Sequence, residues 1–235
     1  MMQATQIESM LIALGDETIA AHSQRYFKTA VGEYGHGDRF LGIRMPVLRQ
    51  QVKQQSGIAL DELQLLLTSE YHEVRIFALL ALVARYQVAD AQGQQQIYQI
   101  YLAHTQYINN WDLVDCSAHL IVGAYLFDKD LAPLYQLARS TSLWERRIAM
   151  IACLYFIRQQ QLGPCFNVAE ILQHDNEDLI HKAVGWMLRE AGKRDLAAEE
   201  AFLAKHYRTM PRTMLRYAIE KLPQSRRQQY LQGLA

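Results

Sequence analysis

The sequence has few of the residues that interrupt helices or cross-link a small fold. Its 235 residues include only five prolines, twelve glycines and three cysteines. So few breakers leave long uninterrupted stretches, which favour helices over a β fold with many turns. Cys116, Cys153 and Cys165 show no CxxC spacing. We therefore expect neither a disulfide framework nor a zinc site, and a reducing cytoplasm is the default location.

Long apolar runs, leader sequences and cofactor motifs are also lacking. No apolar stretch approaches the ~18 residues of a membrane span, and the first residues lack the features of a signal peptide. The eight histidines contain no HExxH pattern, and no GxSxG or Cys/His nucleophile pattern appears. The glycines at 32, 35, 37 and 42 do not form a phosphate-binding loop and indicate a long ordered loop instead. We expect no membrane association, no metal and no cofactor.

Net charge is zero, but it is unevenly distributed. Residues 1–178 carry 13 Lys/Arg against 19 Asp/Glu, whereas residues 179–235 carry 11 against 5. Such asymmetry is a hint of binding to nucleic acid or another acidic surface. A basic helical face is more often merely solvated, so the hint does not decide the matter alone.

Helical periodicity dominates what remains, and no alternation of Val, Ile and Thr predicts a strand. Several segments begin with charged residues and continue with small apolar residues, as expected if they are copies of one repeated helix. The aligned small residues Ala78, Ala149, Gly185 and Ala218 are separated by 71, 36 and 33 residues, and residues 111–124 supply a copy within the first gap. A helical period near 36 indicates a HEAT- or armadillo-like solenoid of antiparallel helix pairs. We expect an all-α single domain over residues 1–235, with second helices lining a concave face. Helices should begin near Asp16, Pro46, Asp61, Ser142 and Pro211.

Trp186 lies off the predicted core face of its helix. The core stripe is formed by Ile180, Val184, Met187, Leu188 and Ala191, whereas Lys182, Trp186, Arg189 and Lys193 form a second stripe. A tryptophan among cations suits a nucleic-acid surface. Packing on a neighbouring repeat would also explain an isolated tryptophan, and that alternative stays open.

Trp111 and Asp115 repeat this geometry one turn apart, opposite the apolar side of their helix. A carboxylate in the first turn of a helix interacts favourably with the helix dipole. This explains Asp112 better than Asp115, which lies about one turn further in. Of the adjacent arginines 146 and 147, Arg147 is the one that shares a helix face with Trp144. It could bind DNA from that face, but a salt bridge to a neighbouring helix would explain its position equally well.

Five segments carry a resemblance to a known family. They read RYFK at 25–28, FLGIRMP at 40–46, WDLVD at 111–115, WERRIA at 144–149 and KAVGWMLRE at 182–190. In this order they resemble the AlkD-like DNA alkylation repair enzymes, which are HEAT-like repeat alkylpurine DNA glycosylases. The resemblance spans nearly the whole chain.

The resemblance implies a solenoid that binds duplex DNA on its concave face. It also implies a monofunctional glycosylase that excises cationic N-alkylated purines such as 3-methyladenine and 7-methylguanine. The family's active-site aspartate and arginine fall on Asp115 and Arg147, its two tryptophans on Trp111 and Trp186, and a tyrosine of the DNA cleft on Tyr26.

The excess of Lys and Arg in residues 179–235 fits the same interpretation. We expect a monomer whose partner is duplex DNA containing alkylated bases. Such binding should weaken steeply with salt and carry little sequence preference. Two other functions remain open: a solenoid that binds unusual DNA structures without cleavage, and a protein-interaction scaffold. We expect DNA contacts from Tyr26, Arg44, Lys182, Arg189, Lys193, Arg212 and Arg216.

Overall fold

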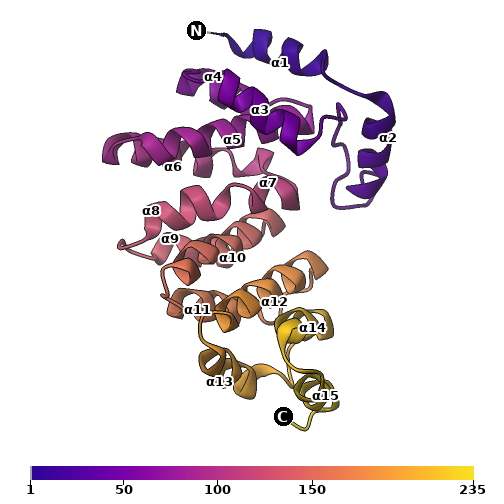
Figure 1. Cartoon of the computed structure of the whole chain (residues 1–235), viewed down its shortest axis with the longest axis vertical. Helices are drawn as coiled ribbons and strands as arrows, with labels where there is room; N and C mark the ends of the chain where they lie inside the picture. Colours follow the sequence, from indigo (N-terminus) through magenta and orange to yellow (C-terminus); the bar gives the residue numbers. More distant parts are fainter. Residues whose placement is uncertain (1) are drawn as a thin grey trace. The chain divides into compact units, whose positions relative to one another are not determined.

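The computed structural model describes residues 2–235 and is all-helical (Figure 1). Within that range no β-strand forms, and one isolated bridge joins Arg39 to Tyr71. The predicted all-α class is therefore confirmed. No helix in the described range has both the length and the apolar character that a membrane crossing requires. The chain divides into two compact units, one up to Ser117 and one from Ala118 onward, and each is described by itself. A single repeat domain over 1–235 stays a prediction.

The first unit is built around α5, which packs against α3, α4, α6 and α7. This helix is buried along most of its length because its residues from Val74 to Leu79 are nearly all apolar. The helices of this unit are α1 (Ala4–Ile12), α2 (Glu17–Tyr26), α3 (Met45–Gln54), α4 (Leu60–Leu67), α5 (His72–Val88), α6 (Ala91–Ala103), η1 (Thr105–Tyr107) and α7 (Trp111–Asp115).

A buried carboxylate at the start of α5 fixes the loop before α3. The Glu73 side chain accepts hydrogen bonds from the backbone N–H groups of Leu41, Gly42 and Ile43, at 2.8, 2.8 and 3.2 Å. Gly42 has a φ of +81°, and a Cβ there would overlap the backbone of Asp16, so only glycine fits. Gly42 is therefore needed for close packing, as expected of the ordered loop predicted from the sequence.

The second unit shows the predicted repeat most clearly. Its helices α10, α12 and α14 begin at Leu143, Asp178 and Arg212, 35 and 34 residues apart. Each is followed by a partner helix, and the pairs pack in sequence (Figure 1). The predicted period near 36 and the helix pairs are confirmed. The elements of this unit are η2 (His119–Gly123), α8 (Ala124–Leu126), α9 (Ala132–Ala138), α10 (Leu143–Arg158), α11 (Gly163–Leu172), α12 (Asp178–Gly192), α13 (Leu196–His206), α14 (Arg212–Ala218), η3 (Ile219–Lys221) and α15 (Gln224–Gln232).

Small residues of the repeat lie where helices approach closely. A Cβ on Gly185 of α12 would overlap the Met214 carbonyl and the Tyr217 side chain of α14. A Cβ on Gly123 would likewise overlap the Ala152 carbonyl of α10. The alignment of small residues therefore reflects a packing requirement.

The predicted helix starts agree with the structure. Asp16 and Ser142 are N-caps whose side chains accept from Ile19 N and Glu145 N. Pro46 and Asp61 lie in the first turns of α3 and α4, and Pro211 precedes α14.

The copy over residues 111–124 differs from its prediction. It is not one continuous helix, because α7 ends at Asp115 and a π-helical turn, η2, follows. The wider turn shifts the register. As a result Ile121 and Val122 are fully buried, whereas Leu120 and Ala124 are only half-buried.

Candidate nucleic-acid site

In the first unit, the short helix α7 carries both Trp111 and Asp115. The helix begins at Asn110, a fully buried residue whose side-chain oxygen accepts from the Trp111 N–H at 2.8 Å. Leu113 and Val114 are buried, whereas Trp111 and Asp115 are each half-buried. The structure therefore places an indole and a carboxylate one turn apart on the accessible side of this helix, as the sequence predicts.

Tyr26 lies beside this pair. Its ring is 6.1 Å from that of Trp111 in an edge-on arrangement, and 59% of the residue is exposed. Phe27 stacks on the inner side of Trp111 with ring centroids 5.2 Å apart. Tyr26 is thus an accessible aromatic neighbour of Trp111, although α2 and α7 are far apart in sequence.

A buried charge cluster lies behind the aromatic rings. The His72 imidazole is 2.7 Å from Asp38 through Nδ1 and 2.8 Å from Asp112 through Nε2. Arg75 donates to the other Asp38 oxygen at 2.5 Å. Burial alone would raise the pKa of the Asp38 carboxyl, but His72 and Arg75 together outweigh it and lower the pKa. Asp112, which the sequence assigned to the helix dipole, is therefore also a partner of His72.

Cys116 follows Asp115 directly but is no candidate nucleophile. Desolvation and the carboxylates of Asp112 and Asp115 raise the pKa of its thiol. The thiol therefore stays protonated at neutral pH, whereas nucleophilic cysteines need the thiolate. Among residues 2–235 no group of His, Cys, Asp and Glu side chains is arranged to hold a metal ion.

In the second unit, Arg147 lies in the first half of α10 and is 5% exposed. Its guanidinium donates to the Leu179 carbonyl at 2.6 Å, in the first turn of α12. The neighbouring Arg146 instead pairs with Asp175, 2.6 Å from Nε. The two adjacent arginines are thus oriented differently, and Arg147 is held by a backbone group at a helix start.

The two stripes predicted on α12 are separated as expected. All five residues of the core stripe are fully buried, whereas Trp186 is half-buried. The indole Nε1 donates to Glu190 at 3.2 Å. Trp186 also lines a cavity of about 330 Å³ with Arg158 and Arg194. Both arginines are exposed, and neither forms an ion pair within the described chain.

Several predicted DNA contacts are partly neutralised by acids of their own unit. Lys182 pairs with Asp178 at 2.7 Å, Lys193 with Glu190 at 2.6 Å, and Arg189 with Glu220. The Arg189 pair could not be found from local spacing because Glu220 lies on another helix, whereas the other two pairs lie four and three residues apart. The remaining predicted cations are exposed: Arg212 donates to the Leu231 carbonyl at 2.8 Å, while Arg44 and Arg216 have no ion-pair partner among residues 2–235.

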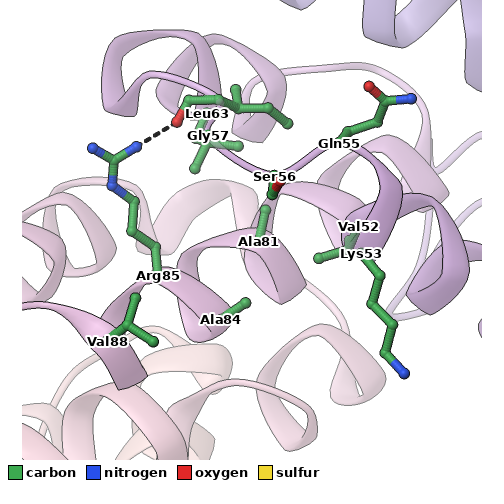
Figure 2. A pocket seen from close by; sticks show the side chains of 11 residues that line it. Val52, Lys53, Gln55, Ser56, Gly57, Leu63, Ala81, Ala84, Arg85 and Val88 are labelled. Carbon is green, nitrogen blue, oxygen red and sulfur yellow. Dashed lines mark hydrogen bonds between the residues drawn. The ribbon is translucent and has the colours of Figure 1, made fainter.

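A separate cavity of about 450 Å³ opens between α3, α4 and α5 (Figure 2). Its wall is mostly apolar, with Val52, Ala81, Ala84 and Val88 among the lining residues. The Arg85 guanidinium lies at one end, hydrogen-bonded to the Ile58 carbonyl. None of the predicted site residues lines this cavity.

Sequence reasoning also missed the residues that support the site. Asp38, His72 and Arg75 had no assigned role, nor had Arg158 and Arg194. A weak signal existed at His72–Arg75, where three charged residues open an otherwise apolar helix. Their partners lie 34 to 40 residues away, so no local pattern could have identified the pairs.

Comparisons with known proteins agree with these observations. A family model described as DNA alkylation repair enzyme matches residues 7–222. A solved structure, described as a predicted DNA alkylation repair enzyme from Enterococcus faecalis, superposes with a TM-score of 0.68. The alignment covers 89% of this chain and 97% of that one at 18% identity, which shows a shared fold. No curated protein matches the sequence significantly.

Proposed function

The chain belongs to the family of DNA alkylation repair enzymes, and from that premise we propose that it is a DNA glycosylase. The substrate would be duplex DNA carrying cationic N-alkylated purines, such as 3-methyladenine or 7-methylguanine. The observation that carries the proposal is the pair on α7: a half-buried carboxylate, Asp115, one turn from a half-buried indole, Trp111. Tyr26 extends this accessible aromatic surface.

The chemistry of the lesion explains why so few groups suffice. An alkylated purine is already cationic, so it leaves with the electron pair of the N-glycosidic bond as a neutral base. The sugar is left with oxocarbenium character, which a nearby carboxylate stabilises electrostatically. Asp115 would supply that negative charge and orient the water that adds to C1′ and loses a proton. No general acid is needed to protonate the base.

The other predicted residues would bind charge that the reaction or the DNA presents. Indole faces stabilise cations by roughly 0.5–2 kcal/mol each, so Trp111 and Trp186 suit a cationic lesion or sugar. Arg147 would contact a backbone phosphate through charge-assisted hydrogen bonds. Its bond to the Leu179 carbonyl supports this role, because it restricts the guanidinium to one orientation.

The experiment is release of free base from methylated duplex DNA by wild type and by Asp115→Asn. The variant keeps size and hydrogen-bonding capacity but removes the charge, so we expect at least a 100-fold slower release in single turnover. Asp61→Asn is the matched control, since Asp61 is an exposed carboxylate in the first turn of α4.

The outcomes separate the possible functions. If wild type releases neither base above background, the glycosylase function is wrong. DNA binding without base release would then favour a non-catalytic DNA-structure-binding protein, and no DNA binding would favour a scaffold. If Asp115→Asn keeps full activity while wild type is active, only the role of Asp115 is wrong.

A further inference from the structure

Four charged side chains form a cluster next to Trp111: His72, Arg75 and Asp38 are buried, and Asp112 is half-buried. They come from α5, from the loop before α3 and from the first turn of α7. The chemistry proposed above uses none of them. Because His72 is only 1% exposed, it acts through its neighbours and not on DNA directly.

Hydrogen bonding fixes the charge of the His72 ring. Each ring nitrogen faces a carboxylate oxygen, Asp38 at 2.7 Å and Asp112 at 2.8 Å. An ionised carboxylate can only accept hydrogen bonds. Both nitrogens must therefore donate, which makes the ring an imidazolium. With Arg75 the cluster contains two cations and two anions, and this balance reduces the cost of burying them.

The cluster is connected to Trp111 in two ways. Asp112 directly follows Trp111 on α7, so the His72–Asp112 bond ties the start of this helix to α5. In addition, His72 lies 5.1 Å from the Phe27 ring, which stacks on Trp111 at 5.2 Å. A displaced His72 would therefore loosen both the backbone of α7 and the ring on which Trp111 rests.

We propose that His72 is a positioning residue that holds α7, and with it the Trp111 indole and the Asp115 carboxylate, in reactive orientation. This inference rests on the glycosylase function proposed above. Misplacement of a reacting group by about 1 Å costs on the order of 100-fold in rate. A cluster that only stabilised the fold would leave the rate per folded molecule unchanged.

The ionisation of His72 gives the proposal a pH signature. The charged groups that face the ring are Asp38 and Asp112, with Arg75 beyond Asp38. Burial by itself would lower the pKa of His72, but Asp112 and Asp38 overcome it and raise the pKa to about 9. Since the folded-state pKa is raised, the contribution of the cluster is complete below about 6.5. It is lost as pH rises through about 9.

The first test needs no DNA and so does not depend on the glycosylase function. Trp144→Phe and Trp186→Phe together leave Trp111 as the only tryptophan. We expect the Trp111 emission of this full-length protein to change between pH 7 and 10 with a midpoint near 9. Adding His72→Gln should abolish that transition. If the emission titrates identically with and without His72, the proposed link from His72 to Trp111 is wrong.

The second test measures single-turnover base release at pH 7.5, below the unfolding temperature of each variant. His72→Gln should release base about 10- to 100-fold more slowly, with DNA affinity within about two-fold of wild type. Asp38→Asn should lose rate in the same direction, because it removes one of the two negative charges that keep the His72 ring protonated. His104→Gln is the control, since His104 is half-buried in the same unit and its ring hydrogen-bonds a backbone carbonyl, that of Ile100, and not a carboxylate.

The results distinguish the two proposals. If His72→Gln keeps the wild-type rate, or slows only in proportion to its unfolded fraction, the positioning role is refuted. If wild type releases no base, the glycosylase function fails, while the Trp111 emission still decides whether His72 orients the indole. If His72→Gln does not fold, the pH dependence of base release decides. The wild-type rate should fall as pH rises through about 9, and Asp38→Asn should change this fall. A wild-type rate that does not change with pH in this range would refute the positioning role of His72.

Discussion

Glu199 of α13 is a buried carboxyl whose removal should change how stability depends on pH. The residue is 3% exposed, and its Oε1 has no hydrogen-bond partner within the described chain. A Cβ at Gly192 would overlap this carboxyl, so the α12 glycine makes room for it. Burial, and to a lesser degree Glu200, raise the pKa of Glu199 to about 8 against the opposing charge of Arg189.

The direction of the effect follows from proton linkage. Between pH 4.5 and about 8 the folded state keeps a proton on Glu199 that the unfolded state has released. Stability is therefore greatest at the acidic end and falls by about 1.4 kcal/mol for each pH unit. Over the whole interval the loss is about 3–5 kcal/mol, and above pH 8 it no longer grows. Glu199→Gln stays neutral throughout and should lack this loss.

The assay is urea unfolding of wild type and Glu199→Gln at pH 5, 7 and 9. We expect nearly equal free energies of unfolding at pH 5 and a variant about 3–5 kcal/mol more stable at pH 9. Glu177→Gln is the control, because Glu177 is an exposed carboxylate that precedes α12. It should follow wild type at every pH. A constant difference between Glu199→Gln and wild type from pH 5 to 9 would refute the reasoning.

Two other predictions concern packing and DNA binding. Gly185→Ala should lower the free energy of unfolding by about 1–3 kcal/mol, because its Cβ would overlap the Met214 carbonyl, a backbone atom. Gly163→Ala, which would meet nothing within 4 Å, should be neutral or slightly stabilising in thermal unfolding; equal losses would contradict the packing argument. Changing Arg158 and Arg194 to Gln should reduce the slope of log K against log salt for duplex DNA by about 1–2, and an unchanged slope would show that neither contacts a phosphate.

The repeat was predictable because it depends on local periodicity. Apolar spacing along α12 predicted its buried face residue by residue, and Ile180, Val184 and Met187 are indeed fully buried. Capping chemistry is equally local, so Asp16 and Ser142 were correctly placed at helix starts. The π-helical turn η2 was not predictable in this way, since its apolar residues fit an α-helix equally well.

The charged residues were predicted less well because their partners are distant in sequence. Arg189 was expected to face DNA, but Glu220 of the next repeat pairs with it. Helical geometry favoured Arg147 over Arg146 as a site residue, which stays a prediction, and the sequence could not show that Arg147 donates to the Leu179 carbonyl. Such pairs depend on which helices become neighbours, and that arrangement is fixed by packing of the apolar faces.

The residues proposed to act on DNA are held by two physically different means, and this difference should determine their sensitivity to pH. Trp111 depends on an imidazolium, so its support is lost as pH rises through about 9. The Leu179 carbonyl that accepts from Arg147 does not titrate. Raising the pH should therefore displace Trp111 and Asp115 of α7 before it affects Arg147 of α10. Base release should fall near pH 9 while phosphate binding by Arg147 persists, because a guanidinium keeps its charge there.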